Sequence, residues 1–324
     1  MKITVIGCGR WGTFIAYYLH SIGEDVTLYG KADDPTTIGL LTERKNSYLT
    51  LPDTLSMSTD IVTALETDTV VISVPSQALR GLFSEIAARD TSVAGAPIPR
   101  RYILCMKGIE IETMMRLSEV TTECAAPGSR VACWIGPGHV EEFVRGTPNC
   151  MVIDSEDDEL KHELADEFSS PLIRFYYGCD LLGNEIGAAS KNVIGIAAGM
   201  LDGIGKTAMK GVLMARGTYE ISRLIGVMGG DPRSAYGLCH LGDYEATVFS
   251  KHSHNRMFGE SFIKGEKYTS LAEGYYTADA MMRLSKKYDV ELPICRTVYE
   301  IIYNGADPDK CLTELFARRM KDEF

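Results

Sequence analysis

The sequence lacks the features that mark membrane-spanning, targeted or nucleic-acid-binding chains. No apolar run approaches the roughly 20 residues that a bilayer-spanning helix needs. Met1 leads directly into the strand-like KITVIG, so we expect no signal or transit peptide. The chain has fewer basic than acidic residues: 33 Lys and Arg against 44 Asp and Glu, which gives a net charge of -11. We therefore expect neither nucleic acid nor membrane insertion among the partners.

Regular cysteine spacing is missing as well. The nine cysteines are an odd number and include no Cys-x-x-Cys pair, which argues against a disulfide framework. Buried free thiols in a reducing cytoplasm are the better interpretation, and we assign no metal site. What remains is ordinary globular composition, 45% hydrophobic and 24% charged over 324 residues. This length is enough for two domains with separate cores.

The pattern of the chain changes once, near residue 180. Before it, short apolar runs such as KITVIG, DVTLYG, DTVVISVP, RYILCMKG and VACWIGPG alternate with helical patterns. Such strands indicate a parallel sheet covered by helices on both faces. After it, segments with a helical period dominate, at 184–201, 207–226, 272–288 and 293–303. We predict an α/β fold with a doubly wound parallel-sheet domain at 1–179 and an all-helical domain at 180–324.

The first strand runs into a glycine-rich turn, VIGCGRWGT. Gly7 permits the tight turn, Gly9 lets the backbone approach a pyrophosphate, and Gly12 lets helix and strand pack closely. The pyrophosphate would meet the free N–H groups and the positive dipole end of the following helix. A strand before and a helix after the glycines favour a Rossmann-type dinucleotide site over a merely tight turn. We include Arg10 and Trp11, which lie within the turn, among the cofactor contacts.

The end of the second strand is where NAD and NADP are told apart. An acid there would bind the ribose hydroxyls of NAD, but this chain has Lys31 after LYG. A lysine favours the 2'-phosphate of NADP, although an ordinary exposed lysine explains the residue nearly as well. We expect NADP or NAD as cofactor, with NADP preferred. Pro75, which ends DTVVISVP, is assigned to the wall beside the nicotinamide.

A lysine lies inside a run of small and apolar residues, GAASKNVIGIAAG, at 187–199. On a helical wheel, Lys191 shares its face with Gly187, Ala188 and Gly195, which lets a neighbour or a ligand come close. A buried lysine is costly unless it is paired or used. Taken alone, Lys191 could snorkel to solvent or bridge to a structural carboxylate.

Other polar groups in the sequence favour a functional role for Lys191 over a structural one. Lys107 follows a strand in CMKGIE, and LGDYEATVFSKHSHNRMFG supplies an acid, hydroxyls, an amide and a guanidinium. Each has a simpler interpretation by itself, since HNR is typical of a polar loop and a single aspartate of a helix cap. Together they suit a small phosphorylated carbonyl compound. The candidates in the second run are Asp243, Thr247, Ser253, Asn255 and Arg256.

The order of these motifs resembles that of the NAD(P)-dependent glycerol-3-phosphate dehydrogenase family over nearly the whole chain. The matching pieces are GCGRWGT, VPSQALR, KGIE, IGPGHVEEF, NEIGAASKNVIGIAAG, ARGTYEISRL, LGDYEAT, SHNRMFG, AEG and ELPICRTVYEI. The runs around Lys191, Asp243 and Asn255 are far more specific than the glycine turn. The resemblance implies hydride exchange between NAD(P)H and dihydroxyacetone phosphate, which gives sn-glycerol 3-phosphate, a glycerophospholipid precursor.

The resemblance also implies roles for single residues. Lys191 would be the proton-transfer residue, Lys107 would reach cofactor and substrate, and Asp243 would line the substrate site and orient Lys191, in a cleft between the domains. We assign catalysis to Lys191, Lys107 and Asp243. We assign substrate contacts to Lys107, Gly136, Gly138, Asn192, Asp243, Thr247, Ser253, His254, Asn255 and Arg256. We assign cofactor contacts to Gly7, Gly9, Arg10, Trp11, Gly12, Lys31, Pro75, Lys107, Val140, His254, Leu271 and Glu273.

The chain departs from the family pattern in two places. His254 stands where relatives carry an arginine that contacts phosphate and cofactor, and a neutral histidine donates to phosphate only weakly. Gly138 and His139 replace the usual hydroxyl-aromatic pair. Neither change touches hydride or proton transfer, so both bear on substrate identity. The alternatives are a related two-domain dehydrogenase acting on another phosphorylated ketone or hydroxy acid, and an idle NADP-binding protein, which the presence of all three catalytic candidates disfavours.

Oligomeric state and location follow less directly. The resemblance and the apolar C-terminal helices suggest a homodimer, but a buried single-chain core explains these helices equally well. The expected lack of a leader and the free cysteines predict a cytoplasmic protein.

Overall fold

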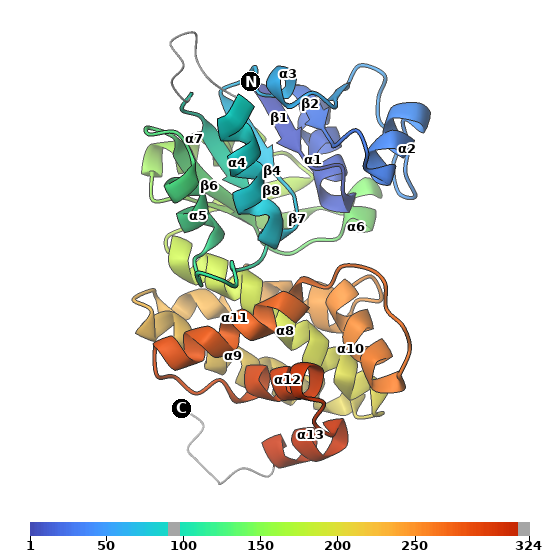
Figure 1. The fold of residues 1–324 in the computed structure, drawn as a ribbon, viewed down its shortest axis with the longest axis vertical. Helices are drawn as coiled ribbons and strands as arrows, with labels where there is room; N and C mark the ends of the chain where they lie inside the picture. The colour runs from blue at the N-terminus through green and yellow to red at the C-terminus, as the bar shows by residue number, and fades with distance from the viewer. Residues whose placement is uncertain (90–97, 317–324) are drawn as a thin grey trace. The chain divides into compact units, whose positions relative to one another are not determined.

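A computed structural model describes residues 1–89 and 98–316 (Figure 1). The chain divides into two compact units, Met1–Glu110 with Met115–Leu181 and Ile111–Met114 with Leu182–Phe324. The division falls between Leu181 and Leu182, whereas the sequence placed it between residues 179 and 180. Residues 317–324 of the predicted helical domain lie outside the described residues.

The first unit contains a mostly parallel sheet. Its strands are β1 (Lys2–Ile6), β2 (Asp25–Tyr29), β3 (Ser56–Ser58), β4 (Thr69–Ile72), β5 (Arg101–Leu104), β6 (Arg130–Ile135), β7 (Asn149–Asp154) and β8 (Ile173–Tyr177). They are ordered β3-β2-β1-β4-β5-β6-β7-β8. Every neighbouring pair is parallel except β6 and β7, so the predicted parallel sheet contains one antiparallel pair.

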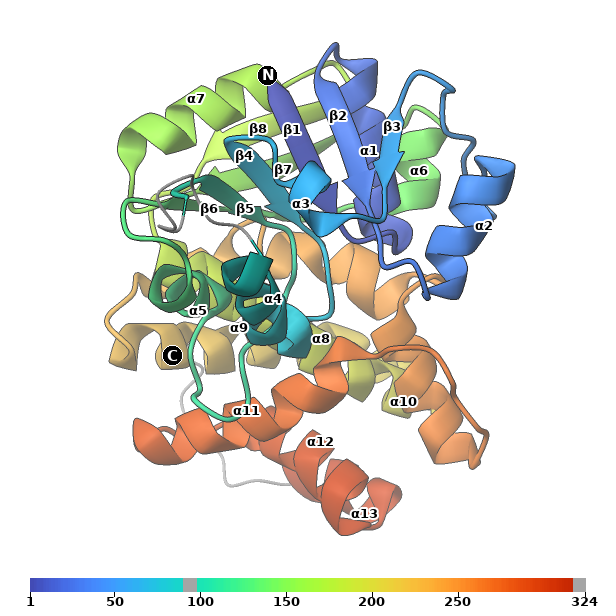
Figure 2. The same ribbon diagram turned by 45° about the horizontal axis from the view of Figure 1, so that its top comes forward.

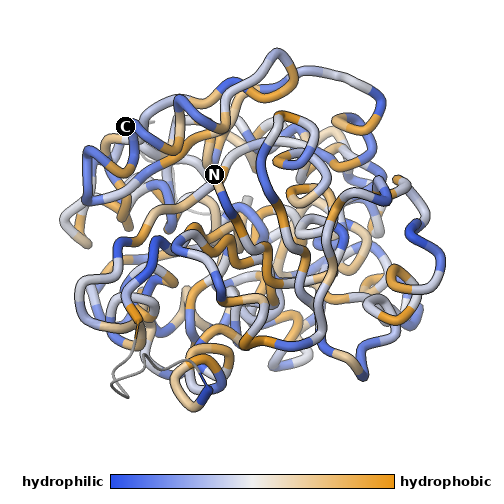
Figure 3. The backbone as a smooth tube through the Cα atoms, turned by 90° about the horizontal axis from the view of Figure 1, so that it is seen from above, coloured by the Kyte–Doolittle hydropathy of each residue, from blue (hydrophilic) through white to orange (hydrophobic). Residues whose placement is uncertain are grey.

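Helices cover both faces of this sheet, as a doubly wound fold requires (Figure 2). They are α1 (Arg10–Ser21), α2 (Pro35–Glu43), α3 (Ile61–Ala64), α4 (Leu79–Arg89), α5 (Leu117–Cys124), α6 (Val140–Val144) and α7 (Asp158–Phe168). On the face of α1 and α7, the Trp134 ring lies 5.7 Å from Phe168, and the Tyr18 hydroxyl donates to the Phe168 carbonyl. Hydrophobic colours follow the strands and hydrophilic colours the outer turns (Figure 3).

The second unit is helical. Its helices are α8 (Leu181–Gly203), α9 (Lys210–Val227), α10 (His254–Lys264), α11 (Glu273–Lys287), α12 (Pro293–Asn304) and α13 (Pro308–Phe316). The four segments with a helical period are confirmed as α8, α9, α11 and α12, whereas α10 and α13 were not predicted. Short turns join α9 to α10: the 3₁₀ turns η3 (Pro232–Tyr236) and η4 (Leu241–Asp243) and the π-helical turn η5 (Glu245–Phe249).

Candidate active site

The turn between β1 and α1 has the geometry that a diphosphate site needs. Gly7 has a φ of 120°, and a Cβ there would lie 2.2 Å from the Ser73 carbonyl oxygen, so only glycine fits. A Cβ on Gly12 would lie 2.0 Å from the Gly7 oxygen, which lets α1 start close to the turn. Gly9 is the N-cap of α1, and a Cβ there would meet no atom of the described chain within 4 Å. The open side of Gly9 gives a diphosphate access to the first N–H groups of α1.

Arg10 and Trp11 in the first turn of α1 contact protein side chains. Arg10 Nη2 forms an ion pair with Glu141 of α6. The Trp11 ring lies 5.5 Å from Phe14 and 6.1 Å from Phe143, measured between ring centroids. Their predicted contact with a cofactor stays a prediction.

Lys31 follows β2, the strand beside β1. Its side chain is 65% exposed, and Nζ lies 3.7 Å from Glu85 Oε2 in α4. The acid Asp34, three residues further along, is the N-cap of α2 and accepts a hydrogen bond from Thr37 N at 2.9 Å. The end of β2 therefore presents an exposed ammonium group, while Asp34 is engaged in capping.

The other predicted residues of the first unit follow adjacent strands. Pro75 comes after β4, Lys107 after β5, and Gly136 and Gly138 after β6, and Val140 begins α6. Lys107 Nζ donates to the Gly136 carbonyl at 2.6 Å. Open α/β sheets bind ligands at the carboxyl ends of their strands, where the strand order reverses, here between β1 and β4. The predicted cofactor residues of this unit thus lie along one edge of the sheet.

The departure at Gly138 has a local structural cause. Its φ is 147°, which favours glycine, and a Cβ there would lie 2.3 Å from Phe143 Cε2. The Phe143 ring stacks on Phe14 with centroids 5.2 Å apart. A hydroxyl-bearing residue at position 138 would strain the backbone and displace this ring, so the missing hydroxyl is tied to the packing of α1 and α6.

Lys191 on α8 is held by two side chains from the segment η4–η5. Its Nζ lies 2.7 Å from Asp243 Oδ2 and donates to Thr247 Oγ1 at 2.7 Å. The Lys191 side chain is 8% exposed and that of Asp243 1%, so the snorkelling alternative was wrong. A buried ammonium requires a counter-charge and hydrogen bonds, and these two residues supply both.

Asn192 and Asn255 connect α8, α10 and the start of α11. Asn255 Nδ2 donates to Asn192 Oδ1 at 2.9 Å, and Gly274 N donates to Asn255 Oδ1 at 2.9 Å. Glu273 precedes Gly274 as the first residue of α11. Leu271, just before the helix, is exposed.

The residues predicted to meet a phosphate already have protein contacts. Ser253 is the N-cap of α10 and accepts a hydrogen bond from Arg256 N at 3.3 Å. His254 Nδ1 lies 2.6 Å from the Tyr268 hydroxyl. The contact with Tyr268 orients the His254 imidazole, at the position where the resemblance predicts an arginine.

Arg256 belongs to an ion-pair network that the sequence did not reveal. Its Nη1 donates to Asp202 at 2.7 Å and to Glu260 at 2.8 Å, and its Nε donates to the Ser250 carbonyl at 3.0 Å. Asp202 also pairs with Lys210 at 2.7 Å. The spacing of four residues on α10 could have identified Glu260, but Asp202 lies on α8 and no sequence signal connects it to Arg256.

The small residues on the Lys191 face of α8 admit protein neighbours. A Cβ on Gly195 would lie 2.7 Å from Thr247 Cγ2, and one on Gly187 would lie 3.0 Å from His240 Cβ. At these two positions the group that comes close is a protein neighbour of the same unit. The glycines therefore bring Thr247 and His240 close to the helix that carries Lys191.

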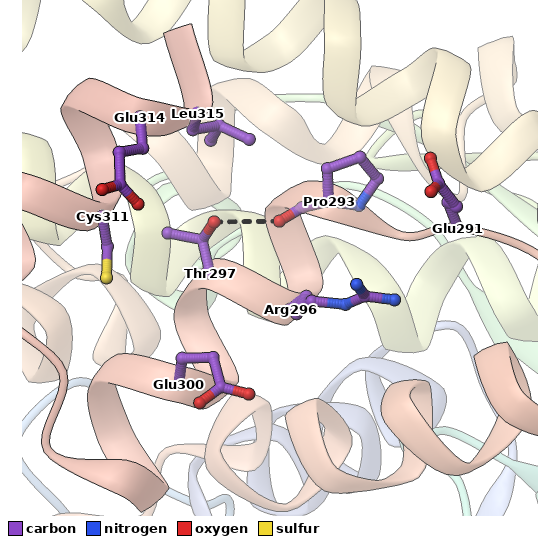
Figure 4. A pocket seen from close by; sticks show the side chains of 8 residues that line it. All are labelled: Glu291, Pro293, Arg296, Thr297, Glu300, Cys311, Glu314 and Leu315. Atoms are coloured by element: carbon purple, nitrogen blue, oxygen red, sulfur yellow. Dashed lines mark hydrogen bonds between the residues drawn. The ribbon is translucent and has the colours of Figure 1, made fainter. Parts of the chain in front are cut away.

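A pocket of about 360 Å³ lies elsewhere in the second unit, along α12 and α13 (Figure 4). It is lined by Glu291, Pro293, Arg296, Thr297, Glu300, Cys311, Glu314 and Leu315. None of the predicted site residues is among them. Within residues 1–89 and 98–316, no group of three or more His, Cys, Asp or Glu side chains is placed to hold a metal ion. No helix in this part of the chain has the length and apolar character needed to cross a bilayer.

Comparisons with known proteins agree over the whole chain. Residues 2–161 match the family model for the N-terminus of NAD-dependent glycerol-3-phosphate dehydrogenase, and residues 180–313 match that for its C-terminus. The chain is 37% identical over 339 residues to the glycerol-3-phosphate dehydrogenase (NAD(P)+) of Chlorobium limicola, covering 100% of this chain and 99% of the relative. It is 34% identical over 341 residues to that of Chlorobium phaeobacteroides, with the same coverage.

A solved structure agrees as well. The crystal structure of glycerol-3-phosphate dehydrogenase from Coxiella burnetii matches with a TM-score of 0.89 and 26% identity, over 98% of this chain and 99% of that one. A TM-score this high over nearly the whole of both chains shows that they share one fold. Since both family models and full-length relatives above 30% identity match, the chain belongs to the NAD-dependent glycerol-3-phosphate dehydrogenase family.

Proposed function

We propose that this chain interconverts dihydroxyacetone phosphate and sn-glycerol 3-phosphate with NAD(P)H. The observation that carries the proposal is the buried Lys191, held at 2.7 Å by both Asp243 and Thr247. When bound, the nicotinamide supplies the hydride for reduction and accepts it for oxidation. Lys191 donates its proton to the ketone oxygen as this becomes an alkoxide, and takes it back in the reverse reaction.

The residues around Lys191 support this role. Asp243 and Thr247 both bond to the Lys191 ammonium, which orients Nζ. Proton donation by a positioned group contributes roughly 100- to 10,000-fold. The positive charge of Lys191 also stabilises the oxyanion that develops on the substrate, and Lys107 adds to this effect.

The first unit fits a dinucleotide. Gly7, Gly9 and Gly12 would hold the diphosphate, because the turn is open at Gly9 and closed by packing at the other two. Pro75 and Lys107 would lie on the nicotinamide side. We prefer NADP as cofactor, since Lys31 is exposed beyond β2 where an acid would favour NAD.

The substrate phosphate would be bound by Asn255 and Arg256, with His254 as a further donor. Arg256 is held by Asp202 and Glu260 through Nη1, and its Nη2 has no acceptor within the described part of the chain. A planar guanidinium fixed on one side suits an anion on the other.

The test is a substrate panel with purified protein. We expect NADPH oxidation with dihydroxyacetone phosphate at a kcat/KM far above that with other phosphorylated ketones or with 2-oxo acids, which a hydroxy acid dehydrogenase would reduce. The replacement of arginine by His254 favours one second candidate, a related dehydrogenase for another phosphorylated ketone. A higher kcat/KM with such a ketone would select it. Cofactor binding without turnover on any member of the panel would contradict both.

Three finer proposals concern the location, the oligomeric state and the metabolic role of the protein. A cytoplasmic location is supported by nine cysteines without a disulfide. A homodimer is supported by the family resemblance and by apolar side chains exposed on the second unit, such as Val212 and Phe249, and light scattering of the purified chain would test it. Supply of sn-glycerol 3-phosphate for glycerophospholipids follows if reduction is the physiological direction.

A further inference from the structure

A histidine without a role in this mechanism lies beside the catalytic pair. His240 is fully buried and occupies the N-cap position of η4, the turn that ends at Asp243. Its carbonyl oxygen accepts the hydrogen bond of Asp243 N at 3.1 Å. The backbone of His240 and that of Asp243 therefore form one tight turn.

The ring of His240 is bonded at both nitrogens. Nδ1 lies 2.8 Å from the carbonyl oxygen of Gly187 in α8, and Nε2 lies 2.7 Å from the Tyr244 hydroxyl. Because a carbonyl oxygen only accepts, Nδ1 carries the proton and Nε2 accepts from Tyr244. Burial lowers the pKa of the imidazole to about 4. The ring is thus neutral and fixed in one tautomer near neutral pH.

These two hydrogen bonds connect His240 to the backbone next to Lys191 and to the residue next to Asp243. In an α-helix, the carbonyl of Gly187 is the acceptor for the backbone N–H of Lys191, four residues later. Tyr244 directly follows Asp243 in the chain. The missing side chain at position 187 allows the approach, since a Cβ there would lie 3.0 Å from His240 Cβ.

We propose that His240 is a positioning residue for the Lys191–Asp243 pair, which it holds together by bonding the η4 turn to α8. This rests on the proposed role of Lys191 in proton transfer. The ring touches neither reacting atom; it sets the separation between the helix that carries the ammonium and the turn that carries the carboxylate. Proton-transfer geometry is sensitive to such a separation, because a displacement of about 1 Å can cost about 100-fold in rate.

Three substitutions test this inference. His240→Phe keeps a ring but removes both hydrogen bonds, and we expect kcat to fall about 10- to 100-fold. The KM for NADPH should change by less than about twofold, because neither Gly187 nor Tyr244, to which His240 is bonded, is a predicted cofactor residue. The pH at which kcat is half-maximal should shift. His240→Asn keeps a donor near the Nδ1 position and should restore most of kcat and the pH profile. Ser285→Ala is the control, since it removes another buried hydrogen bond of this unit, to the Val290 carbonyl, and should leave the pH profile unchanged.

A purely structural role predicts another result. If His240→Phe lowers only the folded fraction, and kcat per folded molecule and the pH profile equal those of the unaltered protein, the proposal is overturned. If His240→Phe does not fold, His240→Gln decides, because its amide lies near the Nε2 position and cannot bond Gly187. The inference requires a lower kcat for His240→Gln than for His240→Asn, and equal values with equal pH profiles overturn it.

Lys191→Ala separates this inference from the proposed function. Near-normal turnover of Lys191→Ala would remove the proposed function itself. A collapse of turnover in Lys191→Ala together with an unchanged His240→Phe would remove only the positioning role.

Discussion

Lys191 is a charge that the fold keeps away from water. Its ammonium has a carboxylate and a hydroxyl at 2.7 Å, and both partners come from the short segment η4–η5. Removing a charge from water costs several kcal/mol unless a partner compensates, so a pair of this kind is costly to break. A mechanism that uses the lysine explains why the chain carries it in a helix of small and apolar residues.

The first prediction concerns that pair. Asp243→Asn should lower the free energy of unfolding by about 3–5 kcal/mol, because it leaves the Lys191 ammonium buried without a counter-charge. Urea unfolding followed by circular dichroism measures the effect. Asp309→Asn is the control: it breaks the exposed ion pair with Lys206 and should cost less than about 1 kcal/mol. Equal costs for the two variants would contradict a buried, interdependent pair.

The second prediction concerns cofactor choice. Lys31→Ala should lower kcat/KM for NADPH by about 10-fold, the loss of one exposed charge contact to the 2'-phosphate, and leave kcat/KM for NADH nearly unchanged. Lys45→Ala serves as control, because Lys45 has a similar exposure and a similar 3.7 Å ion pair, with Glu43. Equal losses for NADPH and NADH in Lys31→Ala would show that Lys31 does not distinguish the cofactors.

For single residues, the sequence predicts those that belong to motifs. It misses those whose partners are brought close only by the packing of distant segments. The residues around Lys191 left a buried and a snorkelling lysine open, and the family resemblance indicated Asp243 as its partner. His240 was not identified, because a single histidine in LCHLGD has no spacing that relates it to Gly187. The contact of Arg256 with Asp202 likewise joins residues of α10 and α8 that no motif connects.

Among the helices, α12 begins with a carboxylate supplied by a different helix. Glu220 of α9 is buried, and its two oxygens accept hydrogen bonds from Ile294 N at 2.8 Å and Cys295 N at 3.0 Å. The first N–H groups of a helix have no partners within it, and the local N-cap residue, Leu292, has no side-chain acceptor. Glu220 therefore links α9 to α12 through the start of α12.

The third prediction follows from this cap. Glu220→Ala should lower the free energy of unfolding by about 2–4 kcal/mol, because two buried N–H groups lose their acceptors. Chemical unfolding measures it. Asp60→Ala removes the exposed cap of the short helix α3 and should cost about 1 kcal/mol. A Glu220→Ala cost no larger than that of Asp60→Ala would contradict a buried tertiary cap.

The sequence predicts an element well when an apolar period repeats over several turns. It predicts an element poorly when contacts with distant residues determine the structure. Helices α8, α9, α11 and α12 have several turns of apolar period, which is why their segments were found. Strands β3, β7 and β8 were not predicted, and β7 runs antiparallel to β6. On the edge strand β8 the alternation of buried and exposed residues covers only four positions before Tyr177, which is exposed like Tyr176, so the period-2 signal is short.

On the scale of the whole molecule, pattern alone gave the class of fold. Alternating apolar strands and helices, then helices only, predicted a doubly wound unit followed by a helical one, and the structure confirms both.

The fourth prediction is the pH dependence of stability. Burial lowers the pKa of His240 from 6.5 to about 4, so the unfolded chain binds more protons than the folded one between these values. The contribution of His240 to the free energy of unfolding is therefore complete above pH 6.5 and is lost as pH falls toward 4, by up to about 3 kcal/mol. The Arg130 hydrogen bonds lower the pKa of Asp157 from 3.8 to about 2, and that contribution disappears only at still lower pH.

Urea midpoints at pH 7, 5.5 and 4.5 measure this dependence. The difference in stability between the unaltered protein and His240→Asn should shrink as the pH falls. If the stability of the unaltered protein and that of His240→Asn differ by the same amount from pH 7 to 4.5, the assignment of the acid sensitivity to His240 is contradicted.

The most direct test of the whole account is the turnover of Lys191→Ala with dihydroxyacetone phosphate and NADPH. The account predicts a loss of kcat of about 100-fold or more, because proton donation and oxyanion stabilisation are both removed. The dissociation constant for NADPH, measured by fluorescence, should change little, and circular dichroism should show a folded protein. Near-normal turnover in a folded Lys191→Ala protein would contradict the central claim that this buried amine is the proton partner of the substrate.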